Sequence, residues 1–279
     1  MQAPRMYRFF LSLTFIYCAL SLANPVHAID KNEHENTDGT PLASKVYDRL
    51  AAVDATTRAQ MVLYNDNVES RRRTFYSYAK DKGMSERWTL LRFVEPNDIA
   101  GTGLLTLDYK GDNSTQWLYL PALDRVRRIS SSRKGGHFVG SDFYYEDLMD
   151  REVDMDRHKL LGSEVIDEIQ CQRLESVPVD PSNSVYSKRV SWINPETLVP
   201  LRVDFFKENK LTPVKRLTAK KIELIQDHWT VFESTMENLE SGSYTQLITS
   251  QIVYDQGLPD ELFTQRALED DRREAQFRP

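Results

Sequence analysis

The sequence contains two clusters of arginine residues whose charge and spacing indicate a binding function more directly than those of any other side chains. The first occupies positions 71–73, and the second contains Arg125, Arg127 and Arg128. Guanidinium groups bind phosphates and carboxylates through charge-assisted hydrogen bonds, so both clusters suit anionic headgroups or an acidic partner. The alternative is that they cover strand ends and the polar face of a sheet. We predict that Arg125, Arg127 and Arg128 contact a headgroup or a protein partner, because they lead into an unusual glycine- and aromatic-rich segment.

No complete catalytic or metal-binding pattern occurs in the sequence. It lacks the Gly-x-Ser-x-Gly elbow of hydrolases, a His-Glu-x-x-His pair and a Cys-x-x-Cys pair, and its histidines are scattered. The acidic residues Asp142, Glu146, Asp147 and Asp150 are interrupted by aromatic residues, which favours a solvated helix face over a calcium loop. We therefore predict no catalytic residue, no metal and no cofactor, and we expect that the protein is not an enzyme.

The segment at residues 130–151 combines glycines with large apolar side chains. Gly135, Gly136 and Gly140 precede Phe143 and Tyr144. Ser141 or Asp142 could cap a short helix that carries the aromatic residues. Such a segment is either a surface loop or a plug that covers one face of a sheet. We favour the plug, because large apolar side chains are seldom left in water.

Most of the chain after Thr57 alternates apolar and polar residues with a period of two. Leu105, Leu107, Trp117 and Tyr119 belong to such runs, and turn-forming clusters separate the runs every ten to twenty residues. This pattern is typical of antiparallel strands with one wet face. We predict ten or eleven strands in meander order within one domain. Before them, apolar residues at helical spacing predict a helix over residues 44–55.

The first 28 residues have the organisation of a secretory signal peptide. Arg5 and Arg8 precede an apolar run, and Val26, His27 and Ala28 form a small-x-small cleavage site. Removal of this segment changes the net charge from −6 to −8, because it contains two arginines and no acidic residue. An acidic exported protein is a poor candidate for nucleic-acid binding. The predicted organisation is a signal peptide at 1–28, a flexible leader at 29–43, the folded domain at 44–265 and a charged C-terminal tail at 266–279.

A series of short motifs resembles a known family. The motifs are, in order, Phe-Val-Glu-Pro at 93–96, Gly-Thr-Gly-Leu-Leu at 101–105, Trp-Leu-Tyr-Leu-Pro-Ala-Leu at 117–123, Arg-Val-Arg-Arg-Ile at 125–129, Gly-Ser-Asp-Phe at 140–143 and Tyr-Glu-Asp-Leu at 145–148. Together they resemble the LolA-like outer-membrane lipoprotein-sorting protein family over residues 44–265. The family position before Gly101 is often basic, whereas this chain has Ala100.

This resemblance implies a fold and a cavity. The predicted fold is mainly β (α+β), with a single large curved antiparallel sheet that forms an unclosed LolA-like β-barrel, covered by an N-terminal helix and a helical or loop insertion. The resemblance also implies a hydrophobic cavity for acyl chains, a Gram-negative periplasm and association with exporters of the resistance-nodulation-division type. We predict that nine apolar residues line the cavity or its lid, with a fully packed core as the alternative. They are Leu105, Leu107, Trp117, Tyr119, Phe138, Phe143, Tyr144, Trp192 and Phe205.

The function that follows is a periplasmic carrier that moves lipid or lipoprotein acyl chains between membrane partners. We expect a soluble monomer that touches membranes transiently and delivers its cargo toward the outer membrane or together with an exporter. A long acyl chain resists entering water by on the order of 10 kcal/mol, so a carrier needs an apolar pocket and a lid but no nucleophile. Two alternatives stay open: a sensor module of the same fold that binds a lipid signal, and a hydrolase with an unrecognised site.

Overall fold

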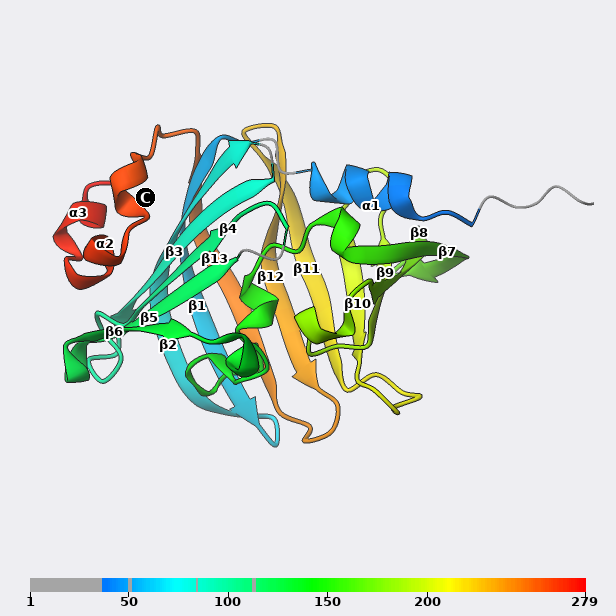
Figure 1. The fold of residues 1–279 in the computed structure, drawn as a ribbon, viewed down its shortest axis with the longest axis horizontal. Coiled ribbons are helices and arrows are strands. Elements are labelled where there is room, and N and C mark those ends of the chain that lie inside the picture. Colours follow the sequence, from blue (N-terminus) through cyan, green and yellow to red (C-terminus); the bar gives the residue numbers. More distant parts are fainter. Residues whose placement is uncertain (1–36, 50–51, 84, 112–113) are drawn as a thin grey trace, which may run out of the picture. The chain divides into compact units, whose positions relative to one another are not determined.

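The computed structural model describes residues 37–49, 52–83, 85–111 and 114–279, and residues 37–279 form one compact unit. The predicted signal peptide and residues 29–36 of the predicted leader lie outside the described residues. Sixteen helices and strands make up the unit besides short 3-10 turns (Figure 1). They are α1 (Thr40–Tyr47), β1 (Asp54–Asn65), β2 (Val68–Gly83), β3 (Glu86–Glu95), β4 (Gly103–Asp108), β5 (Thr115–Leu120), β6 (Arg125–Ile129), β7 (Asp156–Ile166), β8 (Ile169–Pro178), β9 (Lys188–Ile193), β10 (Pro200–Phe206), β11 (Lys215–Ile225), β12 (His228–Asn238), β13 (Tyr244–Tyr254), α2 (Gln265–Glu269) and α3 (Arg272–Ala275).

One antiparallel sheet contains all thirteen strands of the described residues. Its order runs from β6 down to β1, then from β13 down to β7, so β1 and β13 are neighbours in the middle. The predicted meander of ten or eleven strands is correct in type but too low in number. Strands such as β7, whose side chains are mostly exposed at the sheet edge, carry little hydrophobic alternation in the sequence.

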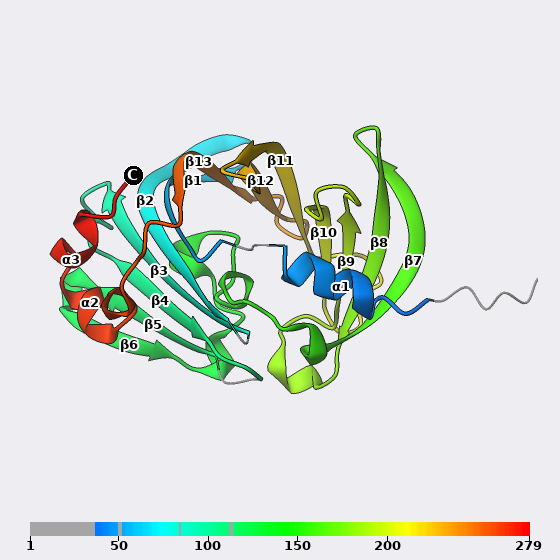
Figure 2. The ribbon, with the colours of Figure 1, turned by 90° about the horizontal axis from the view of Figure 1, so that it is seen from above.

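The two edge strands of the sheet, β6 and β7, follow each other directly in the chain. The residues between them must therefore pass from one edge of the sheet to the other. Figure 2 shows the sheet curving round this connection, so that residues 130–155 lie on its inner side. This confirms the predicted unclosed, curved antiparallel sheet that is covered by an inserted segment.

The N-terminal helix differs from the predicted one in both of its ends. Helix α1 begins at Thr40 with Pro41 in its first turn and ends at Tyr47, instead of covering residues 44–55. Leu42 and Ala43 are buried, so the predicted flexible leader already contributes to the core from residue 40 onward. From Asp54 onward the chain forms strand β1, which pairs with both β2 and β13. Threonine residues favour strands, so this pairing prevails over the helical spacing of the apolar residues.

The C-terminal residues that the sequence suggested would form a charged tail are part of the fold. Helices α2 and α3 lie on the outer side of β3–β6 (Figure 2). Ala267 and Leu268 are buried there, and the carboxylate of Glu274 forms an ion pair of 2.7 Å with Arg92 of β3. The tail prediction is wrong because the few apolar residues of this segment, with one buried ion pair, are sufficient to dock it.

The two faces of the first half of the sheet carry separate cores. On the inner face, Phe75, Phe93 and Leu118 pack with Phe138 of the connection. On the outer face, a second core joins the sheet to the C-terminal segment; its buried members are Tyr78, Leu90, Leu105, Leu258, Leu262, Phe263 and Leu268. Side chains alternate between these faces along each strand, as expected for a pleated sheet.

Candidate ligand-binding site

The connection between β6 and β7, which we call the plug segment (residues 130–155), contains no α-helix. It consists of four 3-10 turns at Ser131–Arg133, Phe138–Gly140, Glu146–Leu148 and Val153–Met155. Gly140 has a φ of 76°, and the hydroxyl of Ser141 donates to the carbonyl oxygen of Phe138. Short turns of this kind replace the predicted helix, because local side-chain hydrogen bonds compete with helical ones.

One end of the plug segment fills the inner face of β1–β5. Phe138 is completely buried there, with its ring 5.8 Å from the ring of Phe93 and 5.7 Å from that of Tyr145, which also belongs to the plug segment. The guanidinium of Arg73 donates to the carbonyl oxygen of Val139 at 2.7 Å and fixes the turn beside Phe138. The aromatic segment is therefore a plug on the sheet and not a surface loop.

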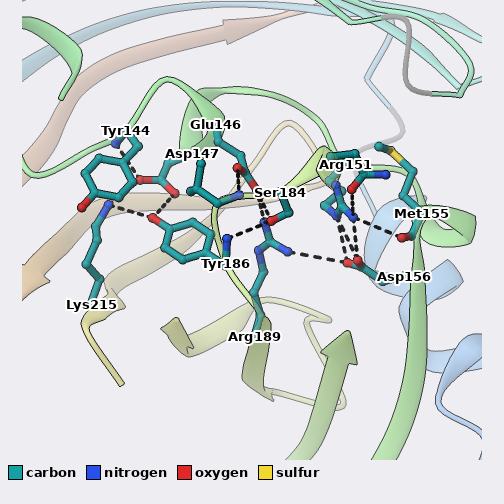
Figure 3. Close-up of polar contacts among 12 residues, drawn as sticks. Tyr144, Glu146, Asp147, Arg151, Met155, Asp156, Ser184, Tyr186, Arg189 and Lys215 are labelled. Atoms are coloured by element: carbon teal, nitrogen blue, oxygen red, sulfur yellow. Dashed lines mark hydrogen bonds and ion pairs between the residues drawn. The ribbon is translucent and has the colours of Figure 1, made fainter. Parts of the chain in front are cut away.

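A buried polar cluster attaches the next turn of the plug segment to the second half of the sheet (Figure 3). The ammonium of Lys215 forms an ion pair of 2.6 Å with Asp147 and donates to the hydroxyl of Tyr186 at 3.0 Å. That hydroxyl donates to the other oxygen of Asp147 at 2.8 Å, and the ring of Tyr144 lies 3.7 Å from the ammonium. All the polar groups that meet here have partners, so the cluster locks the plug segment onto β11.

Burial dominates the ionisation of this cluster. It lowers the pKa of Lys215 from its ordinary value, and the charge and hydrogen bond of Asp147 oppose that change. Burial also raises the pKa of Tyr186, with a further contribution from Asp147. The phenol therefore stays neutral and available as a hydrogen-bond donor to the carboxylate.

Two further contacts extend this attachment along the plug segment (Figure 3). Glu146 forms an ion pair with Arg189 of β9 and accepts a hydrogen bond of 2.7 Å from the amide of Val185. Arg151 forms an ion pair of 2.8 Å with Asp156 at the start of β7. The acidic residues of the plug segment are thus mostly buried in ion pairs, and the predicted solvated helix face is wrong.

Three of the hollows that border the plug segment differ in character. The aromatic pocket has a volume of about 160 Å³ and is lined by Phe143, Phe205, Leu217 and Met236 together with ion-paired groups such as Glu146 and Asp147. The Asp108 pocket has about 330 Å³ and is lined by Ala55, Ala79, Arg87, Asp108, Leu148, Met149 and Asp150, among others. The helix pocket has about 290 Å³ between α1 and β8–β10 and includes Tyr47, Arg87, Asp150, His158, Ser176 and Arg189.

The hollows adjoin one another through residues of the plug segment. Met149 and Asp150 line both the aromatic pocket and the Asp108 pocket. Arg87 and Asp150 line both the Asp108 pocket and the helix pocket. The interior of the sheet is therefore a set of small, partly polar spaces separated by the plug segment, and a movement of this segment would join them.

The structure brings four of the nine predicted cavity residues to the inner face. Phe138 belongs to the inner core, while Phe143, Tyr144 and Phe205 pack together with Tyr186 and Met236. Of these, Phe143 and Phe205 line the aromatic pocket.

The other five predicted cavity residues lie elsewhere. Leu105, Leu107, Trp117 and Tyr119 face the outer side and pack with the C-terminal segment. Trp192 lies on the face of β9 opposite to Ser191 and Ile193, which line the helix pocket, and its ring is 4.2 Å from the guanidinium carbon of Arg202. The structure therefore places these five outside the hollows of the inner face, because a period of two identifies two faces without saying which one is inside.

The three arginines of the predicted headgroup contact lie on edge strand β6 with exposed side chains. Arg127 stands opposite Leu118 and Arg128 opposite Trp117, so these two point to different faces of the sheet. Arg128 has atoms on a hollow of about 260 Å³ beside Ser130 and Lys134. The structure therefore places the three side chains on one strand but not on one surface.

Several residues that shape the interior were missed in the sequence. Lys215 and Leu217 are alternate residues on the inward face of β11. A lysine among inward-facing residues of a strand is the signal that could have identified Lys215. Asp108 likewise ends an inward row that contains Leu104 and Thr106. Their partners come from segments distant in sequence, which no periodicity reveals.

One serine–histidine contact lines the helix pocket. His158 of β7 lies 2.9 Å from the hydroxyl of Ser176 through Nδ1 and 2.7 Å from the carbonyl oxygen of Val153 through Nε2. Among the described residues, no carboxylate hydrogen-bonds this imidazole, so the third member of a catalytic triad is not assembled there. No group of three or more His, Cys, Asp or Glu side chains suited to a metal occurs in the described part of the chain.

Comparison with known proteins identifies the family. The chain is 31% identical to an outer membrane lipoprotein-sorting protein domain from Vibrio parahaemolyticus, over 82% of this chain and 97% of that one, with a TM-score of 0.78. It is 33% identical to a DUF1329 family protein from Desulfovibrio piger, with the same coverage and TM-score. The chain therefore belongs to the LolA-like outer-membrane lipoprotein-sorting protein family, as its motifs suggested.

Other comparisons agree with this assignment. A family model described as "-like: Uncharacterized protein" matches residues 85–270. A LolA superfamily protein from Nitrosomonas europaea shares the fold, with 19% identity and a TM-score of 0.63 over 83% of this chain and 99% of that one. No curated protein sequence matches the chain. In the part of the chain that the structure describes, no helix has the length and apolar character needed to span a bilayer.

Proposed function

We propose that this protein is a periplasmic carrier that holds the acyl chain of a lipid or lipoprotein against the inner face of its sheet. The observation that supports it is the plug segment, which covers the inner face with aromatic side chains but has only short 3-10 turns. A cover without regular secondary structure can move at a lower cost than a helix or strand that is paired along its length. The relatives that are named as lipoprotein-sorting proteins support the same function.

The size of the aromatic pocket requires such a movement. Its volume of about 160 Å³ is close to that of a cavity of about 150 Å³ that accommodates one benzene molecule. A long acyl chain has more than twice as many carbon atoms, so the closed form can hold only its end. Burial of each further CH₂ contributes about 0.8 kcal/mol, and this gain would offset displacement of the plug segment from the sheet.

Three turns at one end of the sheet support transient contact with a membrane. The β1–β2, β10–β11 and β12–β13 turns lie together at the lower end in Figure 1. Lys210 and Glu240 form an ion pair of 3.2 Å between two of these turns. Val68, Leu211 and Leu239 are exposed at the tips, and Leu211 is 99% exposed. Exposed apolar tips beside lysines suit the interface of an anionic bilayer.

The direct test is to purify the mature protein from its native periplasm and to identify bound lipid by mass spectrometry. We expect an acyl-bearing molecule in a fixed ratio to the protein. Recovery of empty protein in repeated preparations, together with no uptake of fluorescent acyl probes, would overturn the carrier function. The same preparation tests the predicted export, because its N-terminus would begin near Ile29.

Filling the aromatic pocket should block acyl binding. We expect Leu217→Trp to weaken the binding of a fluorescent acyl probe by at least about tenfold, because an indole would exclude two or more CH₂ groups at about 0.8 kcal/mol each. Thr218→Trp is the matched control, since residue 218 lies on the opposite face of the same strand. Equal affinities of the two variants would show that the acyl chain does not enter this pocket.

Holding the plug segment in place should also prevent uptake. Asp142 of the plug segment accepts hydrogen bonds from Ser243 at 2.6 Å and from Thr245 at 2.7 Å. We expect that Asp142→Cys and Ser243→Cys, joined by a short bifunctional thiol reagent, reduce the rate of acyl-probe uptake on the order of tenfold or more. The single-cysteine variants treated with the same reagent are the controls, and Cys171 is buried. Undiminished uptake in the joined protein would mean that the plug segment is not the lid.

The finer parts of this function depend on the resemblance. Cooperation with an exporter of the resistance-nodulation-division type, delivery toward the outer membrane and a monomeric state stay predictions. A lipid sensor would use the same pocket, and it differs from a carrier in releasing nothing to an acceptor membrane. Transfer of a labelled lipid from loaded protein to empty vesicles therefore separates the two, because only a carrier accelerates it.

A further inference from the structure

The Asp108 pocket contains more negative charge than its single guanidinium neutralises. Arg87 forms ion pairs of 3.0 Å with Asp150 and 3.4 Å with Asp81. Its remaining nitrogen donates to the carbonyl oxygen of Tyr47, whose ring lies 4.4 Å from the guanidinium carbon. Asp108 is a third carboxylate of the same pocket. One guanidinium therefore faces three carboxylates, and the other cation that lines the pocket, Lys80, is already paired with Asp260, which leaves the pocket short of positive charge.

Other charged groups near this pocket already have partners. Asp147 binds Lys215, and Asp54 accepts hydrogen bonds from the amides of Gly257 and Leu258. Lys80 donates to Asp260 and to the carbonyl oxygen of Leu258. The neighbouring Glu152, which lines the helix pocket, accepts from the amide of Gly111 and adds further negative charge.

One carboxylate oxygen in the pocket has no hydrogen-bond partner. Asp108 is 5% exposed, and its Oδ2 accepts the backbone amide of Asp150 at 2.9 Å. Its Oδ1 is buried and has no hydrogen-bond partner within the described part of the chain, and the nearby hydroxyl of Ser114 lowers the pKa of this carboxyl without pairing that oxygen. A buried acceptor without a donor is costly, so this oxygen marks a place where an N–H or O–H group of a ligand would be stabilised.

We propose that the Asp108 pocket is a subsite for a primary ammonium group that is joined to an apolar chain, such as an ethanolamine headgroup. The inference rests on the proposed function, since the aromatic pocket that would take the chain adjoins the Asp108 pocket at Met149 and Asp150. An ammonium supplies both the missing charge and an N–H donor for Oδ1. The volume of about 330 Å³ is roughly twice that of a cavity that holds benzene, which is sufficient for a small headgroup.

The chemistry of the pocket distinguishes an ammonium from other cations. A quaternary amine such as choline carries the same charge but has no N–H to donate to Oδ1. An anionic group that carries no ammonium would meet the carboxylates of Asp81, Asp108 and Asp150 and would be repelled. Since burial also raises the pKa of Asp108 to about 7, binding of an ammonium should release a proton from this side chain near neutral pH.

The test compares soluble short-chain lipids on the full mature protein by titration calorimetry. Dihexanoyl phosphatidylethanolamine should bind at least about tenfold more tightly than dihexanoyl phosphatidylcholine, because only its ammonium can donate a charge-assisted hydrogen bond to Asp108. In Asp108→Asn the preference should disappear, while phosphatidylcholine binds as before. Asp66→Asn, in the exposed β1–β2 turn, is the control and should keep the preference.

A third probe and a pH series complete the test. Binding of hexylamine that depends on Asp108 would support the subsite and identify a simple amine as a sufficient ligand. The affinity for the ethanolamine lipid should increase between pH 6 and pH 8 in the wild type and stay constant in Asp108→Asn. Equal affinities for the two lipids in the wild type, or a preference that persists in Asp108→Asn, would overturn the subsite and leave the carrier function intact. No binding of either lipid would contradict the carrier function itself.

Discussion

Replacement of Arg92 by methionine should lower the free energy of unfolding by about 3–5 kcal/mol, because it leaves the carboxylate of Glu274 buried without a counter-ion. Both side chains are almost completely buried, at 1% and 0% exposure. Arg92 also donates to the carbonyl oxygens of Gly101, Leu268 and Ala267 at 2.7–2.9 Å. The variant therefore loses the ion pair together with the donors that hold the end of α2.

The double variant Arg92→Met with Glu274→Met separates the charge from the packing. Removal of both charges should restore much of the lost stability, since a buried pair is often replaceable by apolar side chains. Chemical denaturation measures both proteins, and limited proteolysis shows whether the C-terminal segment opens before the sheet. Similar stabilities for the single and the double variant would mean that the unpaired carboxylate is not the cause of the loss.

Arg92 also shows why the sequence alone indicates a charged tail where the structure has a docked C-terminal segment. Its partner is 182 residues away, and the residues around Glu274 are mostly charged. Local composition therefore indicates a solvated tail. The groups that dock this segment are an arginine on the outer face of β3 and a few apolar residues such as Leu268, which lie far apart in the sequence. Only the folded sheet brings these groups together.

The fold class could be predicted from the sequence more fully than the arrangement of side chains in the interior. Alternation and turn residues predict antiparallel strands, because burial of one face of a sheet imposes a period of two. The same period cannot distinguish the inner from the outer face. Trp117 and Phe143 illustrate the difference: Trp117 lies under the C-terminal segment, whereas Phe143 lines the aromatic pocket, although both are large apolar residues in matched family motifs.

The plug segment was predictable as a cover, but its attachment was not. Its glycines and aromatic residues indicate an irregular apolar segment, and the crossing between edge strands β6 and β7 explains where it must run. The sequence places the acidic residues in solvent, because their partners, Lys215 and Arg189, lie on strands far along the chain. A buried ion pair needs two oppositely charged residues, and a single sequence does not reveal which distant residues pair.

Replacement of Asp108 by asparagine should change the pH dependence of stability. Burial raises the pKa of Asp108 from 3.8 to about 7, while the amide of Asp150, Ser114 and Arg87 oppose the change. Between these two pH values the folded protein binds more protons than the unfolded chain. Stability due to this residue is therefore present at low pH and is lost as the pH rises from about 4 to about 7.

The expected size of this effect follows from the shift of about three pKa units, which corresponds to about 4 kcal/mol. Asparagine carries no charge, so Asp108→Asn should be close to the wild type in stability near pH 4 and more stable by a few kcal/mol near pH 8. The comparison of two proteins at each pH cancels the titration of groups that both share, including Arg87, Asp81 and Asp150, which face this side chain.

Urea denaturation of both proteins at several pH values between 4.5 and 8 measures the difference. A difference that does not vary with pH would mean that Asp108 ionises with an ordinary pKa, and that water or a small cation reaches its free oxygen in the empty protein. A difference that grows toward high pH and shrinks when a primary amine is added would connect stability to binding. The ligand would then supply the positive charge that this pocket lacks, and its headgroup would be held by the same carboxylate that destabilises the empty protein.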